Sequence, residues 1–277
     1  MGDSLAATSL QHIVITRFNV RIPGKQAASE EWLTSRLALM RETMIPAIRS
    51  QTVAPDHWLV FCDAYSPDWF KVGITEALAG LGNPVWIEEV CSEDVTPRLI
   101  AKAVQNYVTA SWLITTRVDN DDAISPRFLE VIRSSFDEVE KFINLPRGLQ
   151  YEKNFVFHRV DMSNAFISFV EETSKPVRTV FLDSHHLLKK HGTIVQIRSD
   201  PLWMQIVHGG NIANEVRGVR AFPKCAKDFE INLPIENISY FRYGFLAVSD
   251  VIKLGIHVIF RPEARNKLRR MIFKEFH

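Results

Sequence analysis

The sequence has few cysteines, almost no net charge and no long apolar run, and each shortage excludes a class of protein. Its three cysteines, Cys62, Cys91 and Cys225, lie far apart without the spacing of zinc ligands, which predicts reduced thiols in a cytoplasmic protein. A net charge of +1 over 277 residues gives no field for binding nucleic acid. No apolar run approaches the roughly 20 residues of a membrane span, and the opening MGDSLAATSLQH lacks the apolar core of a signal peptide.

The apolar residues that are present alternate in the manner of an α/β protein. A content of 46% hydrophobic and 23% charged residues is ordinary for a soluble chain with a sizeable core. Short apolar runs predict strands at 12–16, 57–62, 85–90 and 112–114, and helical spacing predicts helices at 32–45, 69–81 and 97–109. Pro46 should end or kink the first of these helices. Strands and helices in this order predict βαβ units and a mostly parallel sheet.

The pattern changes past Pro146. Shorter alternating segments at 154–157, 165–169 and 193–197 predict antiparallel strands at one side of the sheet, with a short helix or turn at 185–191. Helices are expected at 240–253 and, with one apolar and one basic face, at 262–276. We therefore expect one α/β domain over 1–225 and a helical C-terminal extension over 226–277 packed on it.

Three acids follow the apolar run Trp112-Leu113-Ile114. Asp119, Asp121 and Asp122 lie within four residues, and Ser125 and Pro126 then have the pattern of a helix N-cap and first helical residue. Clustered carboxylates repel one another, and their hard oxygens suit Mg²⁺ or Mn²⁺, which in turn binds a diphosphate. The alternative is that these acids favour the following helix dipole without any metal.

Polar residues also follow the first two expected strands, at Thr16–Arg21 and at Asp63, and ligands of open α/β sheets bind at the carboxyl ends of strands. Together with IRSQT (48–52) and the acidic turn, this order resembles the GT-A nucleotide-sugar glycosyltransferases. TRFNVR, TRVDNDDAIS and PLWMQIVHGGNI are similar to segments of the bacterial rhamnosyltransferase family, over about residues 12 to 220. The resemblance implies a GT-A-like fold, with a mostly parallel central sheet flanked by helices and a smaller antiparallel part.

The resemblance also implies a nucleotide site. Thr16, Arg17 and Asn19 would line its floor, and Asp63 would accept a hydrogen bond from the base or ribose, although an aspartate there also caps turns. Arg117 would meet a phosphate, or else neutralise the acids beside it.

For the metal, the resemblance implies Asp121 as a direct ligand, Asp119 facing the ribose or the metal, and His208 as a further ligand. Asp122 would support these groups or cap the next helix. Trp203, in the same segment as His208, would stack on a sugar or lie in the core.

The transfer needs a base that takes the proton of the acceptor hydroxyl. Asp200 is the first candidate, and Asp161 and Asp183 are the runners-up. His185, His186 and His191 are expected at the surface, since no acid accompanies them at useful spacing. The acidic pair typical of the family ahead of a helix is not clear here, which leaves the stereochemistry open.

The function implied is a metal-dependent transfer of a hexose, with rhamnose taken from the family label, from a nucleoside diphosphate sugar to a glycan or lipid-linked acceptor in surface polysaccharide synthesis. One alternative is a nucleotidyltransferase, although its glycine-rich loop is missing, since TRFNVRIPGK has only Gly24. Another is a non-catalytic nucleotide- or glycan-binding module. The basic segment 262–276 would either contact an anionic membrane or pack on the domain with its basic face in water.

Overall fold

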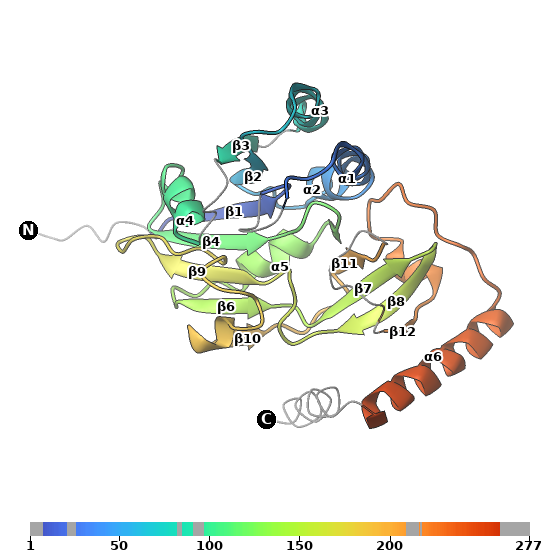
Figure 1. The fold of residues 1–277 in the computed structure, drawn as a ribbon. Coiled ribbons are helices and arrows are strands. Elements are labelled where there is room, and N and C mark those ends of the chain that lie inside the picture. Colours follow the sequence, from blue (N-terminus) through green and yellow to red (C-terminus); the bar gives the residue numbers. More distant parts are fainter. Residues whose placement is uncertain are drawn as a thin grey trace, which may run out of the picture.

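The structure is a computed structural model that describes residues 8–20, 26–81, 85–90, 97–208, 216 and 218–260, with the backbone alone at 85–90, 254 and 256–260. Within these residues the chain forms two sheets with helices around them (Figure 1). The α/β class expected from the sequence is confirmed.

The larger sheet has seven strands in the order β10-β6-β9-β4-β1-β2-β3. Its strands are β1 (Leu10–Arg17), β2 (His57–Asp63), β3 (Val85–Val90), β4 (Trp112–Arg117), β6 (Lys141–Asn144), β9 (Ser168–Glu172) and β10 (Ile194–Gln196). The β4-β1-β2-β3 part is parallel throughout, as the alternation of strands and helices predicts. In this strand order β4, which the acidic turn follows, is the middle strand of the sheet, and its core residues are buried.

Helices cover both faces of this sheet because its central strands are apolar on both sides. Val14 packs on the side of α1 (Glu30–Glu42), α2 (Met44–Arg49), α3 (Asp68–Leu78) and α5 (Phe128–Ser134). Its neighbours Ile13 and Ile15 pack on the other side with α4 (Pro97–Gln105). This two-residue alternation is the pleat of a strand buried on both faces. The expected break near Pro46 is confirmed, since α1 gives way to α2 at Thr43.

The smaller sheet has five strands in the order β12-β8-β7-β11-β5. They are β5 (Ala123–Ile124), β7 (Arg147–Glu152), β8 (Phe155–Val160), β11 (Trp203–Ile206) and β12 (Val219–Arg220). Two 3₁₀ turns, η2 (Leu188–Lys190) and η3 (Pro223–Ala226), and the helix α6 (Tyr240–Phe260) complete the described elements. None of the helices in these ranges has the length and hydropathy needed to cross a membrane.

Trp203 joins the smaller sheet to the core. It is 2% exposed, its indole Nε1 donates to the carbonyl of Leu145 at 2.7 Å, and it stacks on Phe166 at 4.9 Å between ring centroids. Gly148 makes this packing possible, since a Cβ there would lie 2.1 Å from the Trp203 ring. The core interpretation of Trp203 is thus confirmed, and its alternative role as a stacking platform for a sugar is wrong.

Four local expectations need correction. The segment 154–157 lies in the smaller sheet as part of β8, and β10 runs parallel to its neighbour β6 rather than antiparallel. Ser125 is not an N-cap: α5 begins at Phe128, and the Ser125 amide donates to Leu202 O at 2.9 Å while its hydroxyl has no hydrogen-bond partner in the described structure. The helix expected at 240–253 continues to Phe260.

The turn at 188–190 matches the expectation, and Cys62 and Cys225 are not joined in a disulfide, whereas Cys91 lies outside the described residues. So does the expected helix at 262–276. The division into 1–225 and 226–277 stays a prediction.

Candidate functional site

The carboxyl ends of β1, β2 and β4 meet at one edge of the larger sheet, because these three strands are parallel neighbours. The backbone beyond them stays connected: the Phe18 amide donates to Phe61 O at 2.8 Å and the Val118 amide to Ile15 O at 3.2 Å. The predicted site residues at these strand ends are thereby brought together.

The acidic turn starts directly after β4. The Asp122 amide donates to Asp119 O at 3.3 Å, which closes the turn, and the Asn120 side chain reaches Phe18 O at 3.4 Å. The following residues enter β5, which pairs with β11 of the smaller sheet. The turn therefore connects the two sheets, and its three carboxylates have three different environments.

Asp119 forms a two-point ion pair with Arg117. Arg117 Nε lies 3.2 Å from Oδ1 and its Nη2 lies 2.7 Å from Oδ2. Burial alone would raise the pKa of Asp119, but the charge and hydrogen bonds of Arg117, with smaller contributions from Arg17 and His185, together outweigh it and hold this pKa below its usual range. Burial likewise opposes the charge of Arg117, and the Asp119 carboxylate raises the pKa of that guanidinium. The alternative role of Arg117, neutralising the neighbouring acids, is what this geometry supports.

Asp121 is the best-placed carboxylate for a ligand role. It is 6% exposed, and its Oδ2 lies 3.0 Å from His208 Nε2 although the two residues are 87 positions apart. The same oxygen makes an ion pair with Arg36 of α1. The Arg36 guanidinium lies 5.0 Å from the Trp32 ring, and its Nε has no hydrogen-bond partner among the described residues.

The sequence interpretation missed Arg36. A signal was present, because Arg36 shares the buried face of α1 with Leu33, Leu37 and Met40. An arginine on the apolar stripe of a helix needs a buried partner. Asp121 is that partner.

Asp122 serves the smaller sheet. It is 3% exposed, and its Oδ1 accepts from the Ile206 amide of β11 at 2.9 Å. Burial raises the pKa of Asp122 well above its usual range, and the charges of Asp121 and Asp119 add to this effect. It does not cap α5.

Asn19 and Asp63 lie together at the ends of β1 and β2. The Asn19 Oδ1 accepts from the Asp63 amide at 3.1 Å, and its Nδ2 donates to Ser66 Oγ at 2.8 Å. Asp63 Oδ1 accepts from the Tyr65 amide at 3.0 Å, which is the turn-capping geometry that the sequence left open. The contact of Asp63 with a base or ribose stays a prediction.

Thr16 and Arg17 differ in their surroundings. Thr16 is fully buried, and its hydroxyl donates to Val118 O at 2.8 Å and accepts from Trp58 Nε1 at 3.0 Å. That hydroxyl thus holds β1 against its neighbours, and its expected contact with a ligand stays a prediction.

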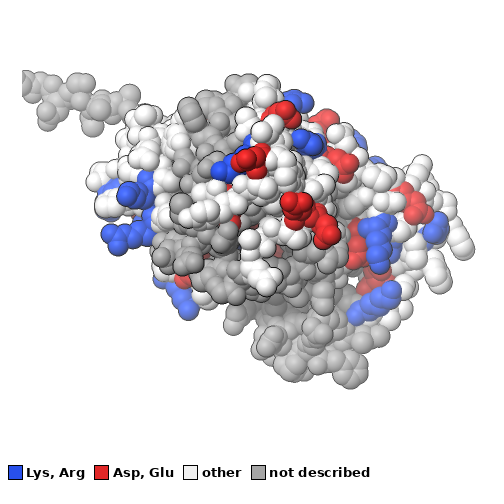
Figure 2. All heavy atoms as spheres, turned by 45° about the horizontal axis from the view of Figure 1, so that its top comes forward, with Lys and Arg blue, Asp and Glu red and all other residues white. Residues whose placement is uncertain are grey.

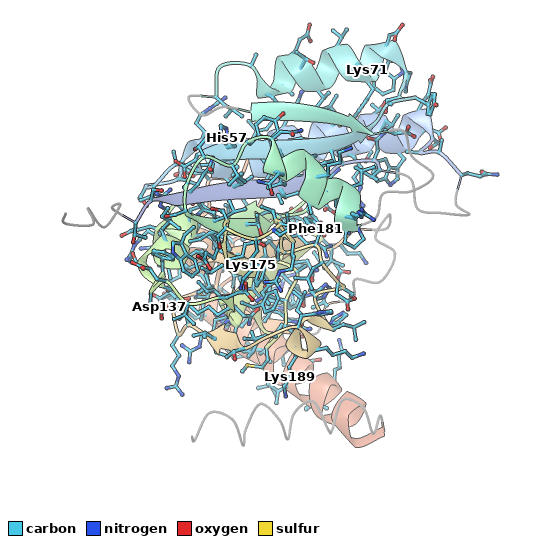
Figure 3. The ribbon with its side chains drawn as sticks, turned by 90° about the vertical axis from the view of Figure 1, so that its left-hand side faces the viewer. His57, Lys71, Asp137, Lys175, Phe181 and Lys189 are labelled. Atoms are coloured by element: carbon cyan, nitrogen blue, oxygen red, sulfur yellow. The ribbon has the colours of Figure 1, made fainter. Side chains whose placement is uncertain are left out.

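Arg17 is exposed, and its guanidinium lies 4.8 Å from the ring centre of Phe181, which Arg117 also approaches at 5.5 Å. Phe181 packs in the core cluster of α4 (Figure 3).

The three candidate bases are not brought together. Asp200 is exposed between β10 and β11. Asp161 Oδ2 pairs with Arg159 at 2.8 Å, and Asp183 Oδ2 pairs with His191 Nε2 at 2.8 Å. The expectation that His191 has no acid partner was therefore wrong, because the chain between them folds back on itself.

His185 is less exposed than the sequence analysis expected. It is half-buried and close to His186, at 3.7 Å between ring centroids. Burial lowers the pKa of His185 to about 4, with His186 and Arg117 adding to the effect, while Asp161 and Asp119 oppose it. The His185 imidazole is therefore neutral near pH 7 and partly buried rather than on the open surface.

The donor set for a metal is small. Within the described ranges, no three His, Cys, Asp or Glu side chains gather to hold a metal ion. Asp121 and His208 do converge, and Mg²⁺ is commonly held by one or two protein carboxylates together with substrate phosphates and water. Imidazole is also an accepted ligand of transition metals such as Mn²⁺. The pair fits the protein's share of such a site, in which a metal would share the Asp121 oxygen with Arg36. The two-point bond to Arg117 weighs more strongly against Asp119 as a ligand, because it occupies both carboxylate oxygens.

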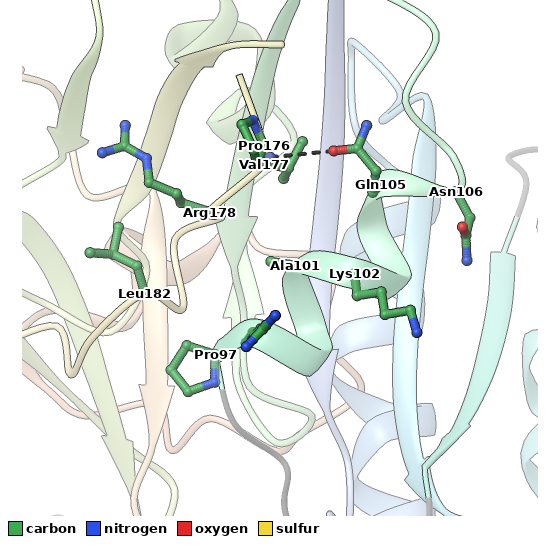
Figure 4. Close-up of a pocket in the computed structure, with 10 residues that line it drawn as sticks. Pro97, Ala101, Lys102, Gln105, Asn106, Pro176, Val177, Arg178 and Leu182 are labelled. Atoms are coloured by element: carbon green, nitrogen blue, oxygen red, sulfur yellow. Dashed lines mark hydrogen bonds between the residues drawn. The ribbon is translucent and has the colours of Figure 1, made fainter. Parts of the chain in front are cut away.

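A separate hollow of about 460 Å³ lies between α4 and residues 176–182 (Figure 4). The Val177 amide donates to Gln105 Oε1 across it at 3.3 Å. No residue that lines it belongs to the acidic turn, so it is not part of the site described above.

Figure 2 shows both signs of charge on the face that carries α1 and α3, in keeping with the net charge of +1.

The protein therefore has an open α/β sheet with polar residues at its strand ends and an acidic turn after its middle strand. In proteins of this class, ligands bind outside the carboxyl ends of the strands. The chain belongs to the family described as "Putative rhamnosyl transferase", whose model matches residues 12–220. No curated protein matches the sequence.

Several solved structures are similar in part. TarS 1–349 of S. aureus in complex with UDP-GlcNAc is 13% identical with a TM-score of 0.43, and the match covers 75% of this chain but 62% of that one. HddC from Yersinia pseudotuberculosis is 12% identical with a TM-score of 0.42, over 70% of this chain and 93% of that one. The inositol-1-phosphate CTP transferase from T. maritima is 11% identical with a TM-score of 0.38, over 75% and 93%. The chain thus spans less than two thirds of the TarS fragment.

Proposed function

We propose that the protein is a glycosyltransferase that moves a hexose from a nucleoside diphosphate sugar to a glycan or lipid-linked acceptor, with Mn²⁺ or Mg²⁺ as cofactor. The observation that carries the proposal is the pairing of Asp121 with His208 at the carboxyl end of the middle strand. Membership in a rhamnosyltransferase family supports the choice of reaction, and rhamnose is the first sugar to test.

The residues at this edge would hold the donor by charge and by hydrogen bonding. The diphosphate is an anion, and Arg17, exposed at the end of β1, is a cation beside the Arg117–Asp119 pair. Asn19 and Asp63 fix the shape of the neighbouring strand ends, where the nucleoside would lie. When bound between Asp121 and His208, the metal would stabilise the charge that develops on the leaving diphosphate.

The acceptor hydroxyl must lose a proton, and Asp200 remains our proposed base. Its exposed carboxylate is open to an arriving acceptor, whereas those of Asp161 and Asp183 are engaged by Arg159 and His191. Asp200→Asn should then lower kcat by about a hundredfold or more while leaving donor affinity unchanged. If kcat fell by this amount in Asp161→Asn or Asp183→Asn but not in Asp200→Asn, the residue replaced in that variant would be the base.

Calorimetry tests the proposal without knowledge of the acceptor. UDP, dTDP and GDP are titrated into the protein with and without Mn²⁺, and at least one should bind in a metal-dependent manner. Asp121→Asn should abolish that binding. Asp228→Asn removes an acid that is 73% exposed in its side chain, far from the turn in sequence, and should have no effect.

Failure of all three nucleotides to bind, or unchanged binding in Asp121→Asn, would contradict the proposal. The positive case leads to a panel of nucleotide sugars assayed for metal-dependent hydrolysis. Release of diphosphate from a nucleoside triphosphate and a sugar phosphate would instead identify a nucleotidyltransferase.

A further inference from the structure

The helix α6 presents an apolar stripe to solvent. Phe241, Phe245, Val248 and Ile252 follow one another at spacings of four, three and four residues and are 91%, 75%, 61% and 57% exposed. Such spacings place side chains on one face of a helix. Figure 1 shows α6 at the margin of the molecule, beyond β12, and six of the twelve large exposed hydrophobic residues among those described belong to this helix.

The opposite face of α6 is fixed to the body, so the stripe cannot turn inward. Tyr243 stacks on Phe222 at 3.6 Å between ring centroids, and its hydroxyl donates to Arg220 O at 3.0 Å. Asp250 accepts from the Arg220 amide at 3.2 Å and pairs with Arg220 Nε at 3.3 Å. These bonds set the rotation of the helix about its own axis.

The charged residues on and after α6 indicate which kind of surface the apolar stripe binds. The single acid of α6, Asp250, is neutralised by Arg220 on the packed side, while the exposed residues Lys253 and Arg242, the latter paired with Glu236 at 3.0 Å, lie along one side of the stripe. The next seventeen residues, 261–277, contain six Lys and Arg against two Glu, a net of +4. Two copies of so basic a region would repel each other, whereas anionic lipid headgroups attract it.

We propose that the apolar face of α6 lies in the surface of an anionic lipid bilayer, parallel to its plane. The stripe enters the boundary between headgroups and acyl chains, and the flanking cations remain among the phosphates. The surface is independent of the donor site, so either proposal can fail without the other.

Vesicle flotation of the full chain tests it. The protein should float with vesicles of phosphatidylcholine and phosphatidylglycerol, float less with phosphatidylcholine alone, and dissociate as salt is raised. The triple variant Phe241→Ser, Phe245→Ser, Ile252→Ser should lower the partition coefficient about tenfold or more, because it removes apolar area that the bilayer buries.

The matched control replaces three large hydrophobic residues that are 54% to 68% exposed on the main domain, as Tyr65→Ser, Val72→Ser, Val139→Ser. This variant should float like the unaltered chain. Equal flotation of both triple variants would overturn the proposal, as would absence of flotation from anionic vesicles. So would a dimer, measured by light scattering, that becomes a monomer only in the α6 variant, since the stripe would then cover a second copy.

Discussion

At the residue scale, the acidic turn shows how one short segment supports three different carboxylates. Asp119 is held as an anion by Arg117, whereas burial favours the protonated form of Asp122, which accepts from a backbone amide. Asp121 is shared between Arg36 and His208. The sequence predicted the cluster because acids after an apolar run are visible locally. It could not predict that Asp121 would meet Arg36, since this cation approaches from the distant helix α1.

Arg36 should be essential to the stability of this arrangement. Arg36→Met removes a guanidinium whose side chain is 10% exposed and leaves Asp121 without its buried cation. The free energy of unfolding, measured in urea, should fall by about 3–5 kcal/mol. Mn²⁺ should restore part of this loss in the variant, since a metal ion supplies the missing positive charge.

Arg127→Met is the control for the Arg36 variant. Arg127 pairs with Glu130 at 3.3 Å, but its side chain is 68% exposed, so the change should cost less than about 0.5 kcal/mol. If the two variants had equal stability, the buried pair would contribute nothing and Arg36 would have no role in holding Asp121.

At the scale of elements, the predictions held wherever local pattern decides the structure. The strands β1, β2 and β4 contain short apolar runs and are separated along the chain by helices, and their parallel pairing follows from the βαβ rule. Ser125 failed as an N-cap because residues 123–125 are drawn into pairing with β11, a contact nearly eighty positions away. The direction of β10 depends on the path of residues 173–193, which no alternation pattern specifies.

The close packing of β7 on β11 gives a prediction at this scale. Gly148→Ala places a methyl group on the Trp203 ring, where the nearest ring atom would be 2.1 Å away, and Trp203 cannot withdraw without losing its hydrogen bond to Leu145. The free energy of unfolding should drop by about 3 kcal/mol or more. Gly244→Ala, in exposed α6 with no atom within 4 Å of the added Cβ, should leave it unchanged or raise it by up to about 1 kcal/mol. Equal thermal midpoints would contradict this account of β7.

At the scale of the whole molecule, stability should depend on pH through a buried histidine of β1. Burial, with a contribution from Arg133, lowers the pKa of His12 to about 3, and its Nε2 lies 2.7 Å from Thr116 Oγ1. In the unfolded chain the same group titrates near pH 6.5. Between these two values only the unfolded chain takes up this proton, so the free energy of unfolding falls as the pH drops, by up to about 1.4 kcal/mol per pH unit.

His12→Gln separates this effect from those of the other titrating groups. The glutamine does not titrate, so the variant should lose less stability than the unaltered chain between about pH 7 and about pH 5, as measured by urea unfolding. Parallel dependence of the two proteins on pH would show that His12 is not the source.

The acidic turn also has a mechanical consequence for the molecule. Asp121 follows a strand of the larger sheet, whereas His208 follows a strand of the smaller one, so their side chains face each other across the junction. The distance between these two groups therefore depends on the angle between the two sheets. Any loosening of that junction, by warming or by a substitution far from the turn, would spread the pair apart and weaken the proposed binding of a metal while each sheet kept its own hydrogen bonds.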